Sequence, residues 1–389
     1  MVIIETEKVP IKSWCNHPEG GALEQVKNLA NLPFTFKHVA LMPDTHEGFG
    51  MPIGGVLATH GHVIPNAVGV DIGCGMCAVR TSIESIHLNH LKDILEQIRR
   101  SVPVGSQHNK LPCDDSMMPT EEVTSRQEYP VIYAEYASAK RQMGTLGSGN
   151  HFIEIQMGSD GRIWIMLHSG SRNLGKKVAD YHNGIARKLN DQSPFPIPSN
   201  WDLASLPWDS YEGQRYLREM NYCLEFARLN RMKMLEKIKQ AFTDNIHKIS
   251  FDDPVNIHHN YAALEEHFGQ QVVVHRKGAT SAREGQIGII PGSQGSKSFI
   301  VVGKGNVESF VSCSHGAGRK MGRKQAIREL NLEQETKAME RKGILHAVKS
   351  KQSLDEAPGA YKDIDVVMKE QDDLVQIAVK LEPLAVVKG

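Results

Sequence analysis

The stretch Val68-Gly69-Val70-Asp71-Ile72-Gly73-Cys74-Gly75-Met76 organises the rest of the chain. Asp71 and Cys74 lie three residues apart, among glycines that let the backbone turn tightly and approach a bound group closely. A carboxylate and a thiolate presented from one tight turn can supply half of a metal site. The alternative is a buried strand that ends in a glycine turn, with Cys74 as a small core residue. The choice between them depends on whether partner ligands exist elsewhere in the chain.

Composition limits the class of protein. The chain has 389 residues, 40% of them hydrophobic and 23% charged, which is typical of a globular fold with a sizeable core. The formal net charge is zero, so only a local basic surface would attract nucleic acid. The six cysteines show no disulfide spacing, no signal peptide opens the chain, and no apolar run approaches ~18 residues. We therefore expect a cytoplasmic protein without a membrane segment.

Apolar periodicity predicts an α+β fold: a single domain over residues 1–389, with a β-sheet core and helices outside. Strands are expected at residues 2–5, 36–42, 53–58, 76–81, 163–167, 272–276, 287–290, 299–302 and 374–387. Helices are expected at residues 21–32, 86–100, 133–143, 176–189, 213–241, 323–341 and 364–372. We expect one domain because the candidate ligands are spread from residue 71 to residue 315.

Five candidate metal ligands are expected in loops that follow strands: Asp71, Cys74, His151, His168 and His259. Each histidine alone is more often a structural residue, but the chain has 18 histidines and these three share one kind of setting. Five ligands exceed the three or four that one zinc ion takes, so the Cys74 thiolate could bridge two ions. Two neighbouring ions suit phosphoryl or nucleotidyl transfer, and ligand types alone leave Zn²⁺, Mn²⁺ and Fe²⁺ open.

Several loops of small residues have the composition of phosphate-binding segments. His315 opens one of them, directly before the helix expected at 323–341, whose N-terminus favours an anion. The loops at 144–150 and 291–298 are rich in glycine and serine, although tight hairpins need the same residues. Asp44 and His46 follow a predicted strand and could form an acid–base pair or support a site, although Asp44 could also simply make a turn.

Ten motifs, in order along nearly the whole chain, make the sequence resemble the RtcB-type RNA ligases. They are MPDTH at 42–46, GVDIGCGM at 69–76, GTLGSGNHFIE at 144–154, LHSGSR at 167–172, HHN at 258–260, RKGA at 276–279, GIIPGS at 288–293, SHGAGR at 314–319, AYKDID at 360–365 and VKG at 387–389. Together these motifs are long and specific enough to make a chance match negligible.

The resemblance implies a GTP- and Mn²⁺-dependent ligase that joins an RNA 3′-phosphate or 2′,3′-cyclic phosphate to a 5′-hydroxyl, in RNA repair or tRNA splicing. Asp71, Cys74 and His151 would hold one Mn²⁺, and Cys74, His168 and His259 the second. His315 would be the nucleophile that takes GMP from GTP and passes it to the RNA 3′ end. The residues implied in GTP binding are Asn150, His151, Phe152, Ile153, Glu154, His259, Asn260, Pro291, Gly292, Ser293, Gln294, Ser298, His315, Gly316, Ala317, Gly318, Tyr361 and Lys388.

Candidate contacts with RNA come mainly from basic loops, and one departure from the family pattern bears on them. The candidates are Asp44, Arg172, Arg276, Arg283 and Arg319, although arginine in a surface loop is usually only solvated. Glu47-Gly48-Phe49-Gly50 stands where several bacterial relatives have Leu-Gly-Lys-Gly, and the missing basic residue puts RNA contacts at this loop in doubt.

Two other functions would use the same residues. One is a metal-dependent RNA end phosphatase or cyclic phosphodiesterase that never ligates, and the other is a non-catalytic RNA-binding scaffold. Retention of every ligand position favours the enzymes over the scaffold. We expect a monomer, and the sequence leaves open whether an activating protein is needed.

Overall fold

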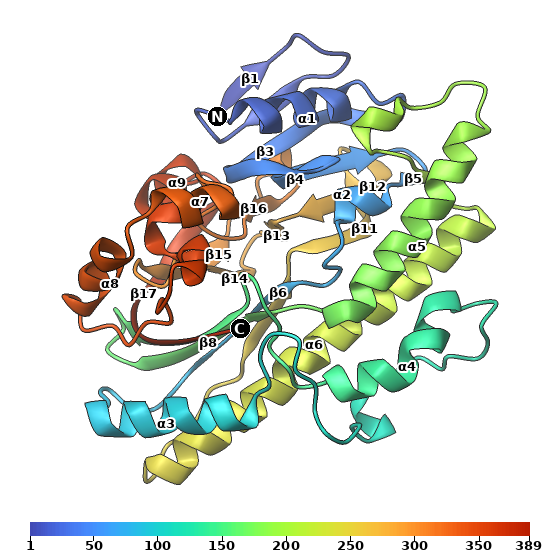
Figure 1. The fold of residues 1–389 in the computed structure, drawn as a ribbon. Coiled ribbons are helices and arrows are strands. Elements are labelled where there is room, and N and C mark those ends of the chain that lie inside the picture. The colour runs from blue at the N-terminus through green and yellow to red at the C-terminus, as the bar shows by residue number, and fades with distance from the viewer.

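Two β-sheets form the centre of the molecule, which the computed structural model describes over all residues, 1–389 (Figure 1). The first sheet has six strands in the order β1 (Val2–Ile4), β2 (Ile11–Ser13), β3 (Thr35–Phe49), β4 (Met51–Thr59), β12 (Gln270–Lys277) and β11 (Asn260–His267). Its neighbouring strands are antiparallel, except that β2 and β3 run parallel. Helix α1 (Gly20–Ala30) covers β3 and β4 with its apolar face.

The second sheet has seven antiparallel strands in the order β10 (Val255–His258), β6 (Gly75–Arg80), β8 (Ile163–Ser169), β7 (Phe152–Gly158), β17 (Val375–Lys388), β15 (Ser298–Gly303) and β14 (Ile287–Ile290). Its edge strands β10 and β14 contact each other, so the sheet curves almost to closure. The chain passes from β10 directly into β11 of the first sheet. Two short ribbons pair β13 (Ala279–Ser281) with β16 (Ser312–Ser314) and β5 (His62–Val63) with β9 (Leu206–Pro207).

Helices lie outside the two sheets (Figure 1). Besides α1 they are α2 (Pro65–Val68), α3 (Leu88–Ser101), α4 (Pro130–Gln142), α5 (Arg172–Asp191), α6 (Tyr211–Asn245), α7 (Arg323–Glu329), α8 (Leu332–Glu340) and α9 (Ile364–Glu370). Helices α4, α5 and α6 pack on one another, and α3 packs on α6 and β17. No helix is both long and apolar enough to cross a membrane.

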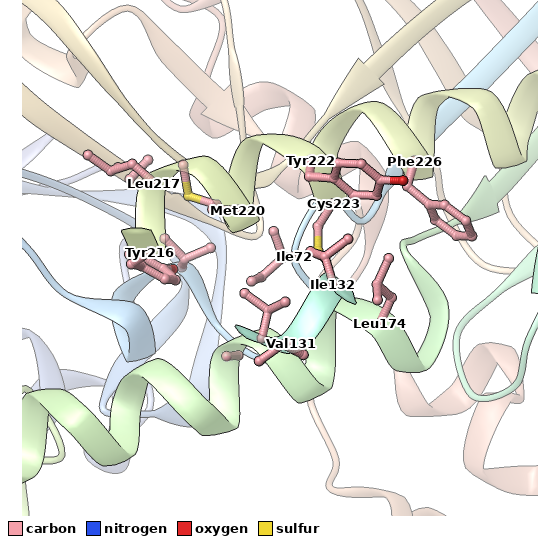
Figure 2. Packing of buried hydrophobic residues seen from close by; sticks show 14 of the residues in the cluster. Ile72, Val131, Ile132, Leu174, Tyr216, Leu217, Met220, Tyr222, Cys223 and Phe226 are labelled. Carbon is pink, nitrogen blue, oxygen red and sulfur yellow. The ribbon is translucent and has the colours of Figure 1, made fainter. Parts of the chain in front are cut away.

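A hydrophobic cluster of 23 buried residues joins α4, α5 and α6 (Figure 2). Leu174 from α5 and Tyr216 and Phe226 from α6 lie in it, and all three are buried. Ile72, from the stretch Val68–Met76 that carries Asp71 and Cys74, also packs in this cluster. The helices therefore hold that stretch in place by ordinary apolar burial.

The α+β fold class is confirmed, and two of the predicted elements differ from the structure by more than a shift of a few residues at their ends. Strand β3 runs on to Phe49 rather than ending at 42, because its pairing with β4 absorbs Pro43 and the glycines as register shifts after Leu41 and after His46. The helix expected at 323–341 is two helices, α7 and α8. Asn331 starts the second one by accepting a hydrogen bond from the backbone N–H of Gln334 at 3.1 Å.

Candidate active site

Asp71 and Cys74 lie in the turn between α2 and β6, not in a strand. Gly73 has a φ of 74°, and a Cβ atom there would come within 3.1 Å of the Cys223 carbonyl oxygen in α6. Glycine is therefore required both by the backbone conformation and by the close approach to the helix. Ile72 and Gly73 pack the turn against the helices, while Asp71 and Cys74 line a cleft on the side of the sheets.

The three histidines come from the second sheet and from the link between the sheets. His151 directly precedes β7, His168 lies within β8, and His259 lies between β10 and β11. The expectation that the ligands follow strands is therefore correct only for His259. In an antiparallel sheet the start of one strand lies beside the end of its neighbour, and here the register pairs Phe152 with His168. Residues at strand starts and strand ends thus meet at one edge.

The five ligand atoms lie close together at this cleft, which all of these residues except His151 line, and we call them the ligand cluster. Cys74 Sγ lies 3.4 Å from His151 Nε2 and 3.2 Å from His168 Nε2. Nε2 of His168 is 3.2 Å from Nε2 of His259, and Asp71 Oδ2 is 3.1 Å from His151 Nε2. The atoms form two groups, Asp71–Cys74–His151 and Cys74–His168–His259, each with all members within 4.8 Å of one another. Cys74 belongs to both groups, so its sulfur would be shared if each group held an ion.

The outer ring nitrogens orient two of the histidines. His151 donates from Nδ1 to the carbonyl oxygen of Leu146 at 2.9 Å, and His168 donates from Nδ1 to that of Asn150 at 3.0 Å. A proton on Nδ1 leaves a lone pair on Nε2 of each neutral ring. Metal-binding histidines are held in this way by a partner on the second nitrogen.

The protonation states of the cluster fit a divalent cation. Burial lowers the pKa of His168 and His259 well below the usual range, so both rings are neutral. Burial and the Asp71 carboxylate raise the pKa of the Cys74 thiol, so a positive charge must stabilise its thiolate. Facing lone pairs and a carboxylate at contact distance supply the nitrogen, sulfur and oxygen donors that a transition-metal ion takes.

Two polar side chains of α6 hold the ligand loops from behind, and the sequence analysis missed both. Asn230 and Arg231 are fully buried, and we call them the α6 frame. Their backbone partners lie in the ligand-bearing segments: Gly73, Gly144, Thr145, Ser169 and Gly170. The available signal was a polar pair inside the apolar stripe of a long helix, between Ala227 and Met234.

His315 follows β16 and lines the same cleft. Its Nδ1 lies 2.6 Å from Oδ2 of Asp44, which is fully buried in β3 and also accepts from the backbone N–H of His315 at 3.1 Å. The rings of His315 and His259 are 4.7 Å apart between centroids. His46 contacts the Asp44 carbonyl oxygen at 2.9 Å and not its carboxylate, so Asp44 and His46 form no acid–base pair.

The cleft above the ligand cluster has a volume of about 800 Å³. Most residues implied in GTP binding line it: Asn150, Phe152, Glu154, His259, Asn260, Pro291, Gly292, Ser293, Gln294, His315, Gly316, Ala317, Gly318, Tyr361 and Lys388. His151, Ile153 and Ser298 lie behind its wall; Ile153 is in the core, and the Ser298 hydroxyl accepts from the Gly292 N–H at 3.1 Å. Burial raises the pKa of Glu154 to about 8.

Glu356, which the sequence analysis did not single out, gathers the cations of this cleft. Its carboxylate lies 2.7 Å from Lys388 Nζ, 2.7 Å from Arg323 and 3.2 Å from Arg319, and it accepts from the Tyr361 hydroxyl. Although burial opposes the shift, Lys388 and Arg323 lower the pKa of Glu356 to about 2. In the sequence, Asp355 and Glu356 resemble two solvated acids. The role of Glu356 becomes apparent only in the fold, where β17 places Lys388 beside it.

The candidates for RNA contact divide by exposure. Arg276 is fully buried and makes two hydrogen bonds to the Glu265 carboxylate, and Asp44 is buried as well, so the structure does not favour an RNA contact for either side chain. Arg172 is half-buried and donates to the protein's own loops, at 3.1 Å to Thr145 Oγ1 and at 3.0 Å to a backbone carbonyl. Arg283 remains accessible, because its side chain is exposed. Arg319 lines the cleft, but its side chain is largely buried and donates to the carbonyl oxygens of Met321 and Asp355.

Comparisons with known proteins agree with this geometry. The family model described as "tRNA-splicing ligase RtcB" matches residues 25–389. The chain is 40% identical to the RNA-splicing ligase RtcB of Escherichia coli K12, over all of this chain and 99% of that protein. It is 32% identical to the tRNA-splicing ligase RtcB of Thermococcus kodakarensis, over 94% of this chain and 91% of that protein. The chain therefore belongs to the RtcB family of RNA-splicing ligases.

Proposed function

We propose that this protein is a GTP- and Mn²⁺-dependent RNA ligase that joins 3′-phosphate or 2′,3′-cyclic phosphate ends to 5′-hydroxyl ends, in RNA repair or tRNA splicing. The observation that carries the proposal is a histidine, His315, held by a buried carboxylate beside a preassembled two-ion ligand cluster. A nucleophile and a pair of metal sites in one cleft are the parts that nucleotidyl transfer needs.

Asp44 prepares His315 for attack. With Nδ1–H donated to the carboxylate, the lone pair of His315 lies on Nε2, and Asp44 stabilises the positive charge that develops on the ring. Nε2 attacks the α-phosphorus of GTP, so a P–N bond forms while the bond from that phosphorus to the pyrophosphate oxygen breaks. The products are pyrophosphate and a histidine–GMP intermediate.

Two further displacements complete the ligation. A 3′-phosphate oxygen of RNA attacks the GMP phosphorus, the P–N bond breaks, and His315 is released with its lone pair on Nε2. The RNA 5′-hydroxyl then attacks the activated 3′-phosphorus, giving a phosphodiester and GMP, while its proton leaves to a base or to water. A cyclic phosphate end first needs hydrolysis to a 3′-phosphate.

The ligand cluster supplies the metal chemistry of these steps. Asp71, Cys74 and His151 would hold one Mn²⁺, and Cys74, His168 and His259 the other. Bound ions would neutralise charge on the reacting phosphates. The guanine would lie among Phe152, Glu154 and Tyr361 on the wall of the cleft, and the cations Arg319, Arg323 and Lys388 would face the anionic parts of the nucleotide.

The test is to incubate the protein with α-³²P-GTP and Mn²⁺, followed by a denaturing gel and acid treatment. Wild type should carry an acid-labile label, and His315→Ala should carry none. The exposed His90→Ala variant is the matched control and should label as wild type does. Asp44→Asn should label more slowly, by roughly 100-fold or more, since the amide does not stabilise a charged ring.

Label on wild type should chase into ligated product when RNA with a 3′-phosphate and a 5′-hydroxyl is added. If wild type with Mn²⁺ bound takes no label but removes the RNA 3′-phosphate, the protein is a phosphatase and not a ligase. Labelling of His315→Ala at the wild-type rate would show that another residue is the nucleophile.

A further inference from the structure

An exposed aromatic ring stands at the tip of the hairpin that joins β3 to β4. Phe49 ends β3, and 67% of its surface is exposed. Of the 11 phenylalanines, only Phe49 and Phe195 are more than half exposed. The ring of Phe49 makes no stacking contact with another ring and no contact with a cation, whereas the partly exposed Phe268 contacts Lys37 and other rings. Phe49 therefore offers an open face without a partner in the protein.

The backbone under this ring is held firmly. Lys277 is buried and donates from Nζ to the carbonyl oxygen of Phe49 and, at 3.0 Å, to that of Asn66. Gly48 exchanges two hydrogen bonds with the Gln25 side chain, at 2.8 Å and 3.0 Å. Exposure of Phe49 is thus a property of a fixed hairpin, and little further ordering would be needed for the ring to bind a ligand.

The hairpin tip is continuous with the cleft of the active site. His46, Glu47 and Gly48, directly before Phe49, line that cleft. Val70, which precedes the ligand Asp71, is 50% exposed. The adjoining Gly69 packs on the stem of Lys277, the residue that also holds the carbonyl of Phe49. Phe49 and Val70 therefore belong to two segments that meet at one buried lysine, and each segment continues into residues that line the cleft, Gly48 and Asp71.

Charge separates this wall from the rest of the cleft. All four lysines and arginines that line the cleft, Arg319, Lys320, Arg323 and Lys388, come from the C-terminal part of the chain. The wall near the hairpin carries Glu19 and Glu47 instead. Phosphate groups are repelled by carboxylates, so a polynucleotide entering here would turn a base rather than its backbone toward this wall.

We propose that Phe49, flanked by Val70, is a stacking platform for an unpaired nucleobase of the RNA close to the end that is joined. Single-stranded RNA is bound largely by stacking of bases on aromatic rings, and every base offers a face for such a contact. The platform would accept RNA ends of different sequence and would draw the strand toward the ligand cluster. The choice of RNA as the ligand rests on the proposed function.

Direct binding tests the platform without any ligation step. Fluorescence anisotropy with a short single-stranded RNA that ends in a 3′-phosphate, or one that begins with a 5′-hydroxyl, should show Phe49→Ala weakening the binding of one of them about 10-fold. Phe49→Trp should retain wild-type affinity, because indole also stacks. Phe195→Ala, which removes the other exposed phenylalanine, should have no effect. Unchanged affinity of Phe49→Ala for both RNAs would overturn the proposal.

Abasic substitution distinguishes stacking from a general apolar contact. Each terminal nucleotide is replaced in turn by an abasic one, and affinity is measured for wild type and Phe49→Ala. At one position, the abasic nucleotide should weaken RNA binding by wild type about as much as the Phe49→Ala change does. The same nucleotide should not weaken RNA binding by the variant further. Equal losses in both proteins at every position would contradict a base on this ring.

GMP labelling separates this proposal from the proposed function. Phe49→Ala should take label from GTP at the wild-type rate without RNA, because the ring lies outside the nucleotide residues. A wild-type protein that takes no label and joins no RNA would contradict the ligase, while the binding and abasic comparisons would still decide the platform. A Phe49→Ala variant that fails to label would contradict the assignment of this ring to RNA alone.

Discussion

The ligand cluster and the α6 frame are both sets of buried polar side chains, but they differ in how their hydrogen-bonding capacity is used. Every nitrogen of the Arg231 guanidinium has a partner: Asn256 Oδ1, the Gly73 and Ser169 carbonyl oxygens, and His258 Nδ1. In the ligand cluster, Nε2 of His168 faces Nε2 of His259 and Sγ of Cys74. Completeness of hydrogen bonding, rather than burial, separates a structural polar group from one prepared for a ligand.

Removing the shared ligand should give the largest effect. Cys74→Ala takes one donor from both metal groups, so ligation should fall by far more than the roughly 10- to 100-fold typical of losing an outer partner of a metal ligand. Manganese bound per chain, measured by mass spectrometry after gel filtration, should fall as well. The matched control is Cys77→Ala, a buried cysteine in a hydrophobic cluster. Full Mn²⁺-dependent activity of Cys74→Ala would contradict the bridging thiolate.

Breaking the α6 frame should damage both stability and metal affinity. Arg231→Met removes the guanidinium donor from the Gly73 and Ser169 carbonyl oxygens, and each buried group left unsatisfied costs about 1–3 kcal/mol. The free energy of unfolding in urea should fall by about 2–5 kcal/mol. The affinity for Mn²⁺ should fall roughly 10- to 100-fold, because the ligand loops lose their support.

Arg228→Met is the control on the same helix. Arg228 is partly exposed and pairs only with Glu225, so neither stability nor Mn²⁺ affinity should change much. If Arg231→Met lowered stability but left Mn²⁺ affinity at the wild-type value, the frame would support the fold without orienting the ligands.

The sequence identified the ligand cluster because the chemistry of its residues is visible one residue at a time. Asp71 and Cys74 are recognisable from their types and spacing, and the three histidines from their glycine-rich or apolar settings. Where these residues sit relative to the strands was not predictable. That placement depends on antiparallel register, which sets a strand start beside a strand end and is determined by tertiary pairing.

The α6 frame and Glu356 escaped prediction for a different reason. A helical period assigns Asn230 and Arg231 to a face but does not reveal that loops from three distant segments end against them. Glu356 becomes the centre of a cation cluster only when the last strand brings Lys388 to it. The fold class needed only periodicity, which is local, whereas these groups acquire partners through long-range contacts.

Glu265 is a buried carboxylate that is fully paired, so its substitution should change stability and not activity. Although burial opposes it, Arg276 lowers the pKa of Glu265 from 4.5 to about 2. The stabilisation is therefore present above pH 4.5 and is lost as pH falls toward 2, at about 1.4 kcal/mol per pH unit. Between pH 5 and 3, wild type should lose more unfolding free energy than Glu265→Gln, and ligation at neutral pH should be nearly equal in the two.

The neighbouring Glu266→Gln variant is the control, because Glu266 is exposed and should leave the wild-type acid dependence unchanged. Parallel acid curves for wild type and Glu265→Gln would contradict a strongly stabilised carboxylate. A large loss of ligation in Glu265→Gln would show that the Glu265–Arg276 pair contributes to activity and not only to stability.

Glu154 contrasts with Glu265, because its buried carboxyl group accepts a hydrogen bond from Gln156 but pairs with no cation. Burial raises its pKa to about 8, so in the empty cleft it holds a proton at pH 7. Guanine presents N–H donors, which an ionised carboxylate accepts best, so nucleotide binding should expel that proton. The affinity for GMP in metal-free buffer should then rise with pH toward 8, by at most about tenfold per unit.

Calorimetry at pH 7 in buffers of different ionisation enthalpy should find close to one proton released for wild type and none for Glu154→Gln. Equal proton release in the two proteins would assign the linkage to another group and would leave Glu154 as a neutral wall of the cleft.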